Sequence, residues 1–79
     1  MSNAITAAEL ELIAKLKTLP QVPQVRAASM LYAQGVKFTD GERQTIRDRK
    51  AIFAQLGMPG RVTVPVFDFG GARIGELIF

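Results

Sequence analysis

The stretch RVTVPVFDFGGARIGELIF, residues 61–79, decides the fold of this chain. Apolar residues alternate with others from Arg61 to Phe67, a second apolar run covers Arg73 to Phe79, and Gly70-Gly71 lies between them. Alternation with a period of two is typical of a strand buried on one face, and paired glycines favour a tight turn. The sequence therefore predicts a β-hairpin over these residues.

Pro65 restricts how the two strands of this hairpin can pair, because proline has no N–H to donate to a ladder. A two-residue Gly70-Gly71 turn would place Pro65 opposite Glu76 in a hydrogen-bonded pair. A three-residue loop, Phe69 to Gly71, would place it opposite Gly75 in a non-bonded pair. We therefore expect the three-residue loop, with Gly71 in the left-handed conformation.

The same register predicts an open edge on the hairpin. The missing donor of Pro65 would point outward, so we expect no third strand to pair normally along the first strand. The second strand, Ile74 to Phe79, is apolar and carries one charge, which leaves it open to pairing with another chain. The residues expected to bind that partner are Ile74, Leu77, Ile78 and Phe79.

Upstream of the hairpin, the sequence predicts three helices. Two capping boxes, in which a threonine stands three residues before a glutamate, predict helix starts after Thr6 and Thr39. Proline and glycine residues after the apolar periodicity predict the helix ends. The expected helices run from about Ala7 to the residue before Pro20, from about Pro23 to Gln34, and from about Asp40 to Leu56. The predicted fold class is α+β, with three helices followed by a C-terminal antiparallel β-hairpin.

Length and composition limit what the chain can be. With 79 residues, it is expected to form a single small domain over residues 5–79. Residues 1–4 include Ser2-Asn3-Ala4, which resembles an expression-vector scar or a disordered native start, and no functional role is expected of them. No long apolar run and no basic start followed by an apolar signal core are present, so we expect a cytoplasmic protein with no membrane contact.

The residue inventory argues against catalysis. Cys and His are both absent, which excludes disulfides, thiolate or imidazole metal sites, and Cys or His nucleophiles. Asp40, Glu42 and Asp48 do not share a helix face, so a paired-carboxylate site is not expected either. We therefore expect no enzymatic activity, no catalytic residues, no metal, no cofactor and no small-molecule substrate.

Positive charge collects on the third helix. Ten Lys and Arg residues against seven Asp and Glu residues give a net charge of +3. Arg43, Arg47 and Lys50 stand at i, i+4 and i+7, on one stripe of the helix. Guanidinium groups bind both phosphates and carboxylates, so this basic stripe favours nucleic acid or an acidic protein as a partner. A solvated helix face is the alternative interpretation.

Arg49 lies at the centre of the apolar face of the same helix, among Ile46, Ile52, Phe53 and Leu56. A guanidinium group in that position needs a partner or access to solvent. We expect either that its aliphatic stem packs while the guanidinium group reaches solvent or pairs with a carboxylate such as Glu76 or Asp68, or that this face is an interface.

The order of elements, three helices and then a hairpin from Arg61 to Phe79, resembles that of winged-helix DNA-binding domains, with the hairpin as the wing. This resemblance implies an alternative function, a nucleic-acid-binding transcriptional regulator in which the basic stripe contacts phosphates. The sequence departs from the helix-turn-helix pattern around Gly35. Leu31 stands where a small residue is usual, and Gly41 stands where a branched aliphatic residue is usual. No family is assigned.

The leading interpretation is a small non-enzymatic interaction module, acting as an assembly adaptor, inhibitor or regulator. It would dock on a protein partner, or on copies of itself as a homo-oligomer, through the edge of the second hairpin strand and the adjoining apolar surface. Backbone hydrogen bonds at the edge and burial of the apolar side chains would supply the affinity.

Overall fold

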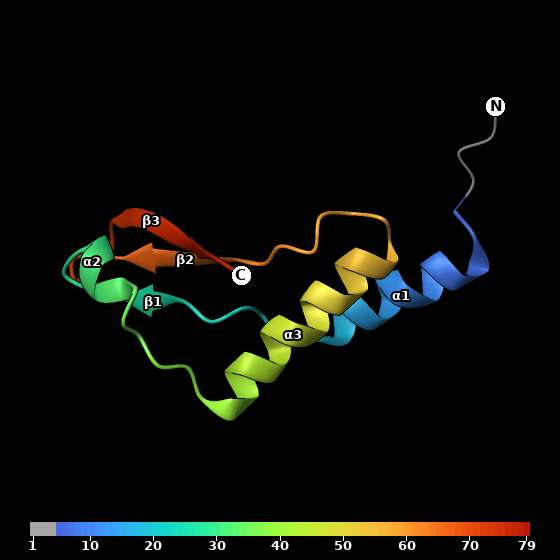
Figure 1. Ribbon diagram of the computed structural model, residues 1–79, viewed down its shortest axis with the longest axis horizontal. Helices are drawn as coiled ribbons and strands as arrows, with labels where there is room; N and C mark the ends of the chain where they lie inside the picture. The colour runs from blue at the N-terminus through green and yellow to red at the C-terminus, as the bar shows by residue number, and fades with distance from the viewer. Residues whose placement is uncertain (1–4) are drawn as a thin grey trace.

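The computed structural model describes residues 5–79 of the chain, so the expectation for residues 1–4 lies outside the described residues. In chain order the elements are helix α1 (Ala7–Thr18), strand β1 (Val25–Arg26), helix α2 (Met30–Ala33), helix α3 (Asp40–Gln55), strand β2 (Thr63–Phe67) and strand β3 (Arg73–Ile78). Figure 1 shows α1 and α3 packed side by side at one end, with the sheet and α2 at the other. The predicted α+β class is confirmed, while the arrangement of three helices and a hairpin is met only in part.

Both predicted helix starts are confirmed by hydrogen bonds. The backbone N–H of Glu9 donates to Thr6 Oγ1 at 3.1 Å. At α3 the capping box is reciprocal, because the N–H of Thr39 donates to Glu42 Oε1 at 2.9 Å and the N–H of Glu42 donates to Thr39 Oγ1 at 3.1 Å. These bonds satisfy backbone donors that a helix start otherwise leaves free.

The predicted second helix, Pro23 to Gln34, is wrong over most of its length. Val25–Arg26 form β1, which pairs with β2 in parallel, and only Met30–Ala33 are helical. Val25 and Ala27 are buried, and the N–H of Ala27 donates to the carbonyl of Phe67 at 2.9 Å. A short apolar segment fits the helical and the strand period equally well, so burial against β2 decides the outcome.

The expectation that Pro65 keeps a third strand from pairing along the first hairpin strand is also wrong. The strand order is β1-β2-β3, which makes β2 the central strand. β1 pairs in register with Val66 and Phe67, the two residues that follow Pro65, and the carbonyl of Phe67 accepts from the N–H of Ala27 at 2.9 Å. The proline therefore limits how far the parallel pairing can extend, but it does not prevent the pairing.

The three-residue loop of the hairpin is confirmed. The N–H of Asp68 donates to the carbonyl of Ala72 at 2.8 Å, which closes a loop of residues 69–71. Gly71 has a φ of 89°, the left-handed conformation expected for it. Asp68 Oδ1 also accepts from the N–H groups of Gly70 and Ala72, each at 2.9 Å. The loop is thus held by one side chain as well as by its glycines.

The register of the hairpin differs from the prediction by one residue. Pro65 lies opposite Glu76 rather than Gly75, because a bulge between the pairs of Val66 and Phe67 leaves Ile74 without a partner across the ladder. Hydrogen-bonded pairs alternate with non-bonded pairs in an antiparallel ladder. Since Val62 and Phe79 exchange two backbone bonds of 3.0 Å, the pair of Pro65 and Glu76 is a non-bonded one. The missing donor of Pro65 therefore points away from β3, as expected, and the bulge changes only the residue that lies opposite it.

The core is small and the molecule is elongated. It measures 48 × 29 × 17 Å, and its radius of gyration is 15.1 Å. A compact domain of this length would have a radius of gyration of roughly 12 Å. No residue of α1 is buried, so the helical end extends beyond the main core. Within residues 5–79 the buried hydrophobic residues are Val25, Ala27, Ala33, Ile46, Ile52, Val62, Val64 and Val66.

Candidate interaction surface

Strand β3 forms one edge of the sheet and pairs only with β2 within residues 5–79. Glu76 and Ile78 lie opposite Pro65 and Thr63 in the non-bonded positions of the ladder. Residues in such positions direct their N–H and C=O groups away from the paired strand. The backbone groups of Glu76 and Ile78 therefore point to the open side of β3, where an extended chain can pair with them.

The four residues predicted to bind a partner divide into two pairs. Ile74 and Leu77 are partly buried and pack against the core, so they contribute to the fold. Ile78 and Phe79 have exposed fractions of 59% and 37% and remain at the surface. The docking role of these residues stays a prediction, and only Ile78 and Phe79 offer substantial apolar area to another molecule.

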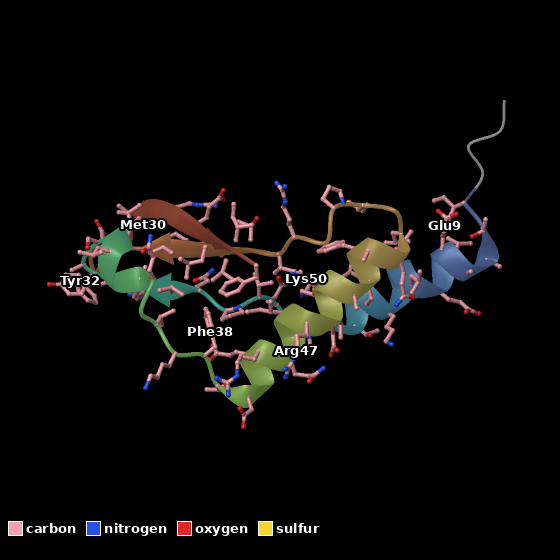
Figure 2. The ribbon with its side chains drawn as sticks, in the orientation of Figure 1. Glu9, Met30, Tyr32, Phe38, Arg47 and Lys50 are labelled. Carbon is pink, nitrogen blue, oxygen red and sulfur yellow. The ribbon has the colours of Figure 1, made fainter. Side chains whose placement is uncertain are left out.

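Phe79 pairs with Phe38, an aromatic residue that the sequence interpretation overlooked. Their ring centroids are 5.5 Å apart with an interplanar angle of 73°, which is the edge-to-face arrangement that aromatic rings prefer. Figure 2 shows Phe38 on the segment between α2 and α3. Phe38 directly precedes the capping box of α3, and an aromatic residue at that position is the signal that could have pointed to a contact.

Two shallow hollows adjoin this aromatic pair. Phe38 and Phe79 line both of them, so the hollows are neighbours on one continuous surface. The first has a volume of about 220 Å³ and is completed by Gln34, Val36, Leu77 and Ile78. The second has a volume of about 230 Å³ and is completed by Arg43, Ile46 and Arg47. The tertiary structure thus brings the apolar edge of β3 next to two residues of the basic stripe.

The three residues of the basic stripe are all exposed, but they have different surroundings. Arg43 forms an ion pair with Asp40 and also donates from Nη1 to the carbonyl of Phe38 at 3.0 Å. Arg47 donates to the neutral side chain of Gln44 at 3.2 Å. Within the described part of the chain, neither Arg47 nor Lys50 forms an ion pair. The free positive charge of the stripe therefore belongs to Arg47 and Lys50.

Arg49 does not pair with either of the expected carboxylates. Its guanidinium group donates to the backbone carbonyl of Pro20, at 3.0 Å from Nε and 2.6 Å from Nη2, and to that of Leu19 at 3.3 Å. Glu76 instead pairs with Arg73 at 2.9 Å. The carbonyls after the end of α1 attract the cation because they have no partner within that helix. Arg49 joins α3 to the end of α1.

A third and larger hollow lies beside β1, at the opposite edge of the sheet. Its volume is about 430 Å³, and the exposed rings of Tyr32 and Phe69 line it together with Val25, Arg26, Ala27, Ala28, Ala33 and Val36. The sequence predicted no binding role for Tyr32 or Phe69.

Other kinds of site are not visible in the described residues. No group of three acidic, His or Cys side chains among residues 5–79 is placed to hold a metal ion. No helix among those residues is long and apolar enough to cross a bilayer. No family model, curated protein or solved structure matches this chain.

Proposed function

We propose that this protein is a small non-enzymatic interaction module that docks on a protein partner, or on a second copy of itself, through the edge of β3. The observation that supports this most directly is the open side of β3, where the backbone groups of Glu76 and Ile78 have no strand to pair with among residues 5–79. An added strand from a partner would take up these groups.

The apolar surface beside the edge supports the same function. Ile78 is 59% exposed and Phe79 is 37% exposed, and both line the hollow of about 220 Å³ next to β3. Backbone pairing supplies affinity, and hollows beside the strand supply selectivity for particular side chains. The small core and elongated shape add a reason for docking, because a domain that buries little of its own apolar surface gains stability from a partner.

The test is a lysine substitution at the edge. Ile78→Lys places a charge on the exposed side chain of an edge strand, a device that blocks strand addition in natural proteins. Leu31→Lys is the matched control, because Leu31 is 76% exposed and lies on α2. Circular dichroism would show whether both variants keep the fold of the unmodified protein.

Sedimentation velocity would measure self-association, and affinity capture from nuclease-treated lysate of the source cells would measure partner binding. We expect Ile78→Lys to abolish the complex that the unmodified protein forms, whether with a partner or with itself. Leu31→Lys should leave that complex intact. A complex that survives Ile78→Lys would contradict docking through β3.

A nucleic-acid-binding regulator is the second candidate. The exposed side chains of Arg47 and Lys50, which lack ion pairs among residues 5–79, favour it. The winged-helix resemblance gives this candidate no support, because a helix-turn-helix motif needs a full helix and Met30–Ala33 form only one helical turn. A gel-shift experiment with duplex DNA and RNA at low salt, comparing the protein with a variant reversed in charge at Arg43, Arg47 and Lys50, tests this candidate. The absence of a shift for the unmodified protein would reject it.

A further inference from the structure

We propose that the occupant of the β3 edge is an extended acidic segment of another protein, with an apolar side chain beside Phe38 and Phe79 and a carboxylate on Arg47. This inference rests on the proposed docking function and names the chemistry of the partner. Its basis is that one continuous surface combines an open strand edge, two small apolar hollows and a cation without an ion pair among residues 5–79.

The size of the hollows favours single side chains as their occupants. They have volumes of about 220 and 230 Å³. Pockets for small-molecule ligands usually measure about 300–1,000 Å³ and enclose most of the ligand. Each hollow here is smaller and shallow, and each is next to the strand end that carries Phe79. An apolar side chain of a peptide therefore fits them better than a cofactor does.

The strand edge favours an extended segment. The outward backbone groups belong to Glu76 and Ile78, two residues apart, which is the spacing that an added β-strand uses. In such a strand, alternate side chains fall on the same face, about 7 Å apart. A segment that places an apolar residue beside Phe79 can thus direct a residue two positions away toward α3. Arg47 of α3 lines the same hollow as Phe79.

The charges favour an acidic segment over a second copy of this chain. Arg43 is already neutralised by Asp40, and the one carboxylate of β3, Glu76, is neutralised by Arg73. Arg47 donates to the neutral side chain of Gln44 and pairs with no carboxylate among residues 5–79. A carboxylate would form a charge-assisted bond with it. A second copy would bring its own net charge of +3 to this surface, and like charges oppose association.

A selection from random peptides tests the chemistry of the occupant without assuming a sequence. A library of random dodecapeptides displayed on phage would be selected on the immobilised protein and depleted on the Ile78→Lys variant. We expect the surviving peptides to be enriched in Asp or Glu two positions from an apolar residue. One survivor would then be synthesised with a fluorescent label, and its affinity would be measured by anisotropy.

The affinity measurement separates the contribution of Arg47 to binding from that of strand pairing at β3. Arg47→Glu should weaken binding of the labelled peptide by about fivefold, because it removes an exposed ion pair and also places a like charge beside the carboxylate of the peptide. The loss should shrink at high salt, because salt screens exposed charges. Lys17→Glu is the matched control, an exposed cation in the last turn of α1, and it should bind as the unmodified protein does.

The possible failures are distinguishable. Survivors without acidic enrichment, or equal affinity for Arg47→Glu and the unmodified protein, would overturn the acidic partner but leave docking through β3 in place. A selection that yields no peptide able to distinguish the unmodified protein from Ile78→Lys would overturn both. Circular dichroism of Arg47→Glu checks that a loss of affinity does not come from unfolding.

Discussion

Replacing Arg49 with methionine tests how the two long helices are held together. The substitution removes the guanidinium group but keeps an unbranched apolar side chain to pack between α1 and α3. It abolishes the hydrogen bonds to the carbonyl of Pro20, at 2.6 and 3.0 Å, and to the carbonyl of Leu19, at 3.3 Å. These bonds link positions about thirty residues apart, so no local interaction within α3 replaces them.

The expected loss of stability follows from the number and exposure of these bonds. A hydrogen bond to a charged group contributes roughly 1.5–3 kcal/mol. Two of the three bonds are exposed and all come from one guanidinium group, so we count them together as about 2 kcal/mol. A domain of 79 residues is stable by roughly 4–12 kcal/mol. The melting temperature should therefore fall by roughly 8–16 °C.

Urea and thermal denaturation, followed by circular dichroism, would measure the change. Arg47→Met is the matched control, because it makes the same chemical change on the same helix, where the Arg47 side chain bonds to Gln44 within α3. We expect that control to change the free energy of unfolding by at most about 0.5 kcal/mol. If Arg49→Met and Arg47→Met have the same unfolding midpoint, the link between α3 and the end of α1 does not stabilise the fold.

Substitutions at three further sites probe local features. Gly75→Ala would place a Cβ 2.5 Å from Sδ of Met30, so the flexible Met30 side chain has to shift, and the free energy of unfolding measured in urea should fall by about 1 kcal/mol. The same substitution in a Met30→Ala background should cost less, and an equal loss in the two backgrounds would contradict this close packing. Asp68→Ala removes the acceptor of two loop N–H groups and should lower the free energy of unfolding by about 1–2 kcal/mol in the same assay. An unchanged urea midpoint would mean that the glycines alone hold the loop. Thr39→Ala should lower the free energy of unfolding by about 1 kcal/mol, and Thr39→Ser, which keeps the capping hydroxyl, should lower it much less. Equal losses for the two variants would argue against a stabilising N-cap at Thr39.

The candidate surface was only partly predictable from the sequence. The strand edge could be predicted, because Ile74 to Phe79 is apolar and belongs to a hairpin. The exposed cations of α3 could be predicted from their spacing along one helix. Their proximity to Phe79 could not, because it depends on how α3 packs against the sheet. Phe38 joins the two regions, and it lies in a segment without any periodicity.

The local sequence determined where α1 and α3 start, that β2 is a strand, and that a left-handed Gly71 closes the hairpin loop. Each of these features depends on residues that lie within a few positions of one another. The tertiary structure alone decided that Val25–Arg26 form a strand, that a bulge at Ile74 shifts the register, and that Arg49 bonds to the end of α1. The physical reason is that short apolar segments and long polar side chains have several partners of similar energy available. The burial and hydrogen bonding of distant residues select among those partners.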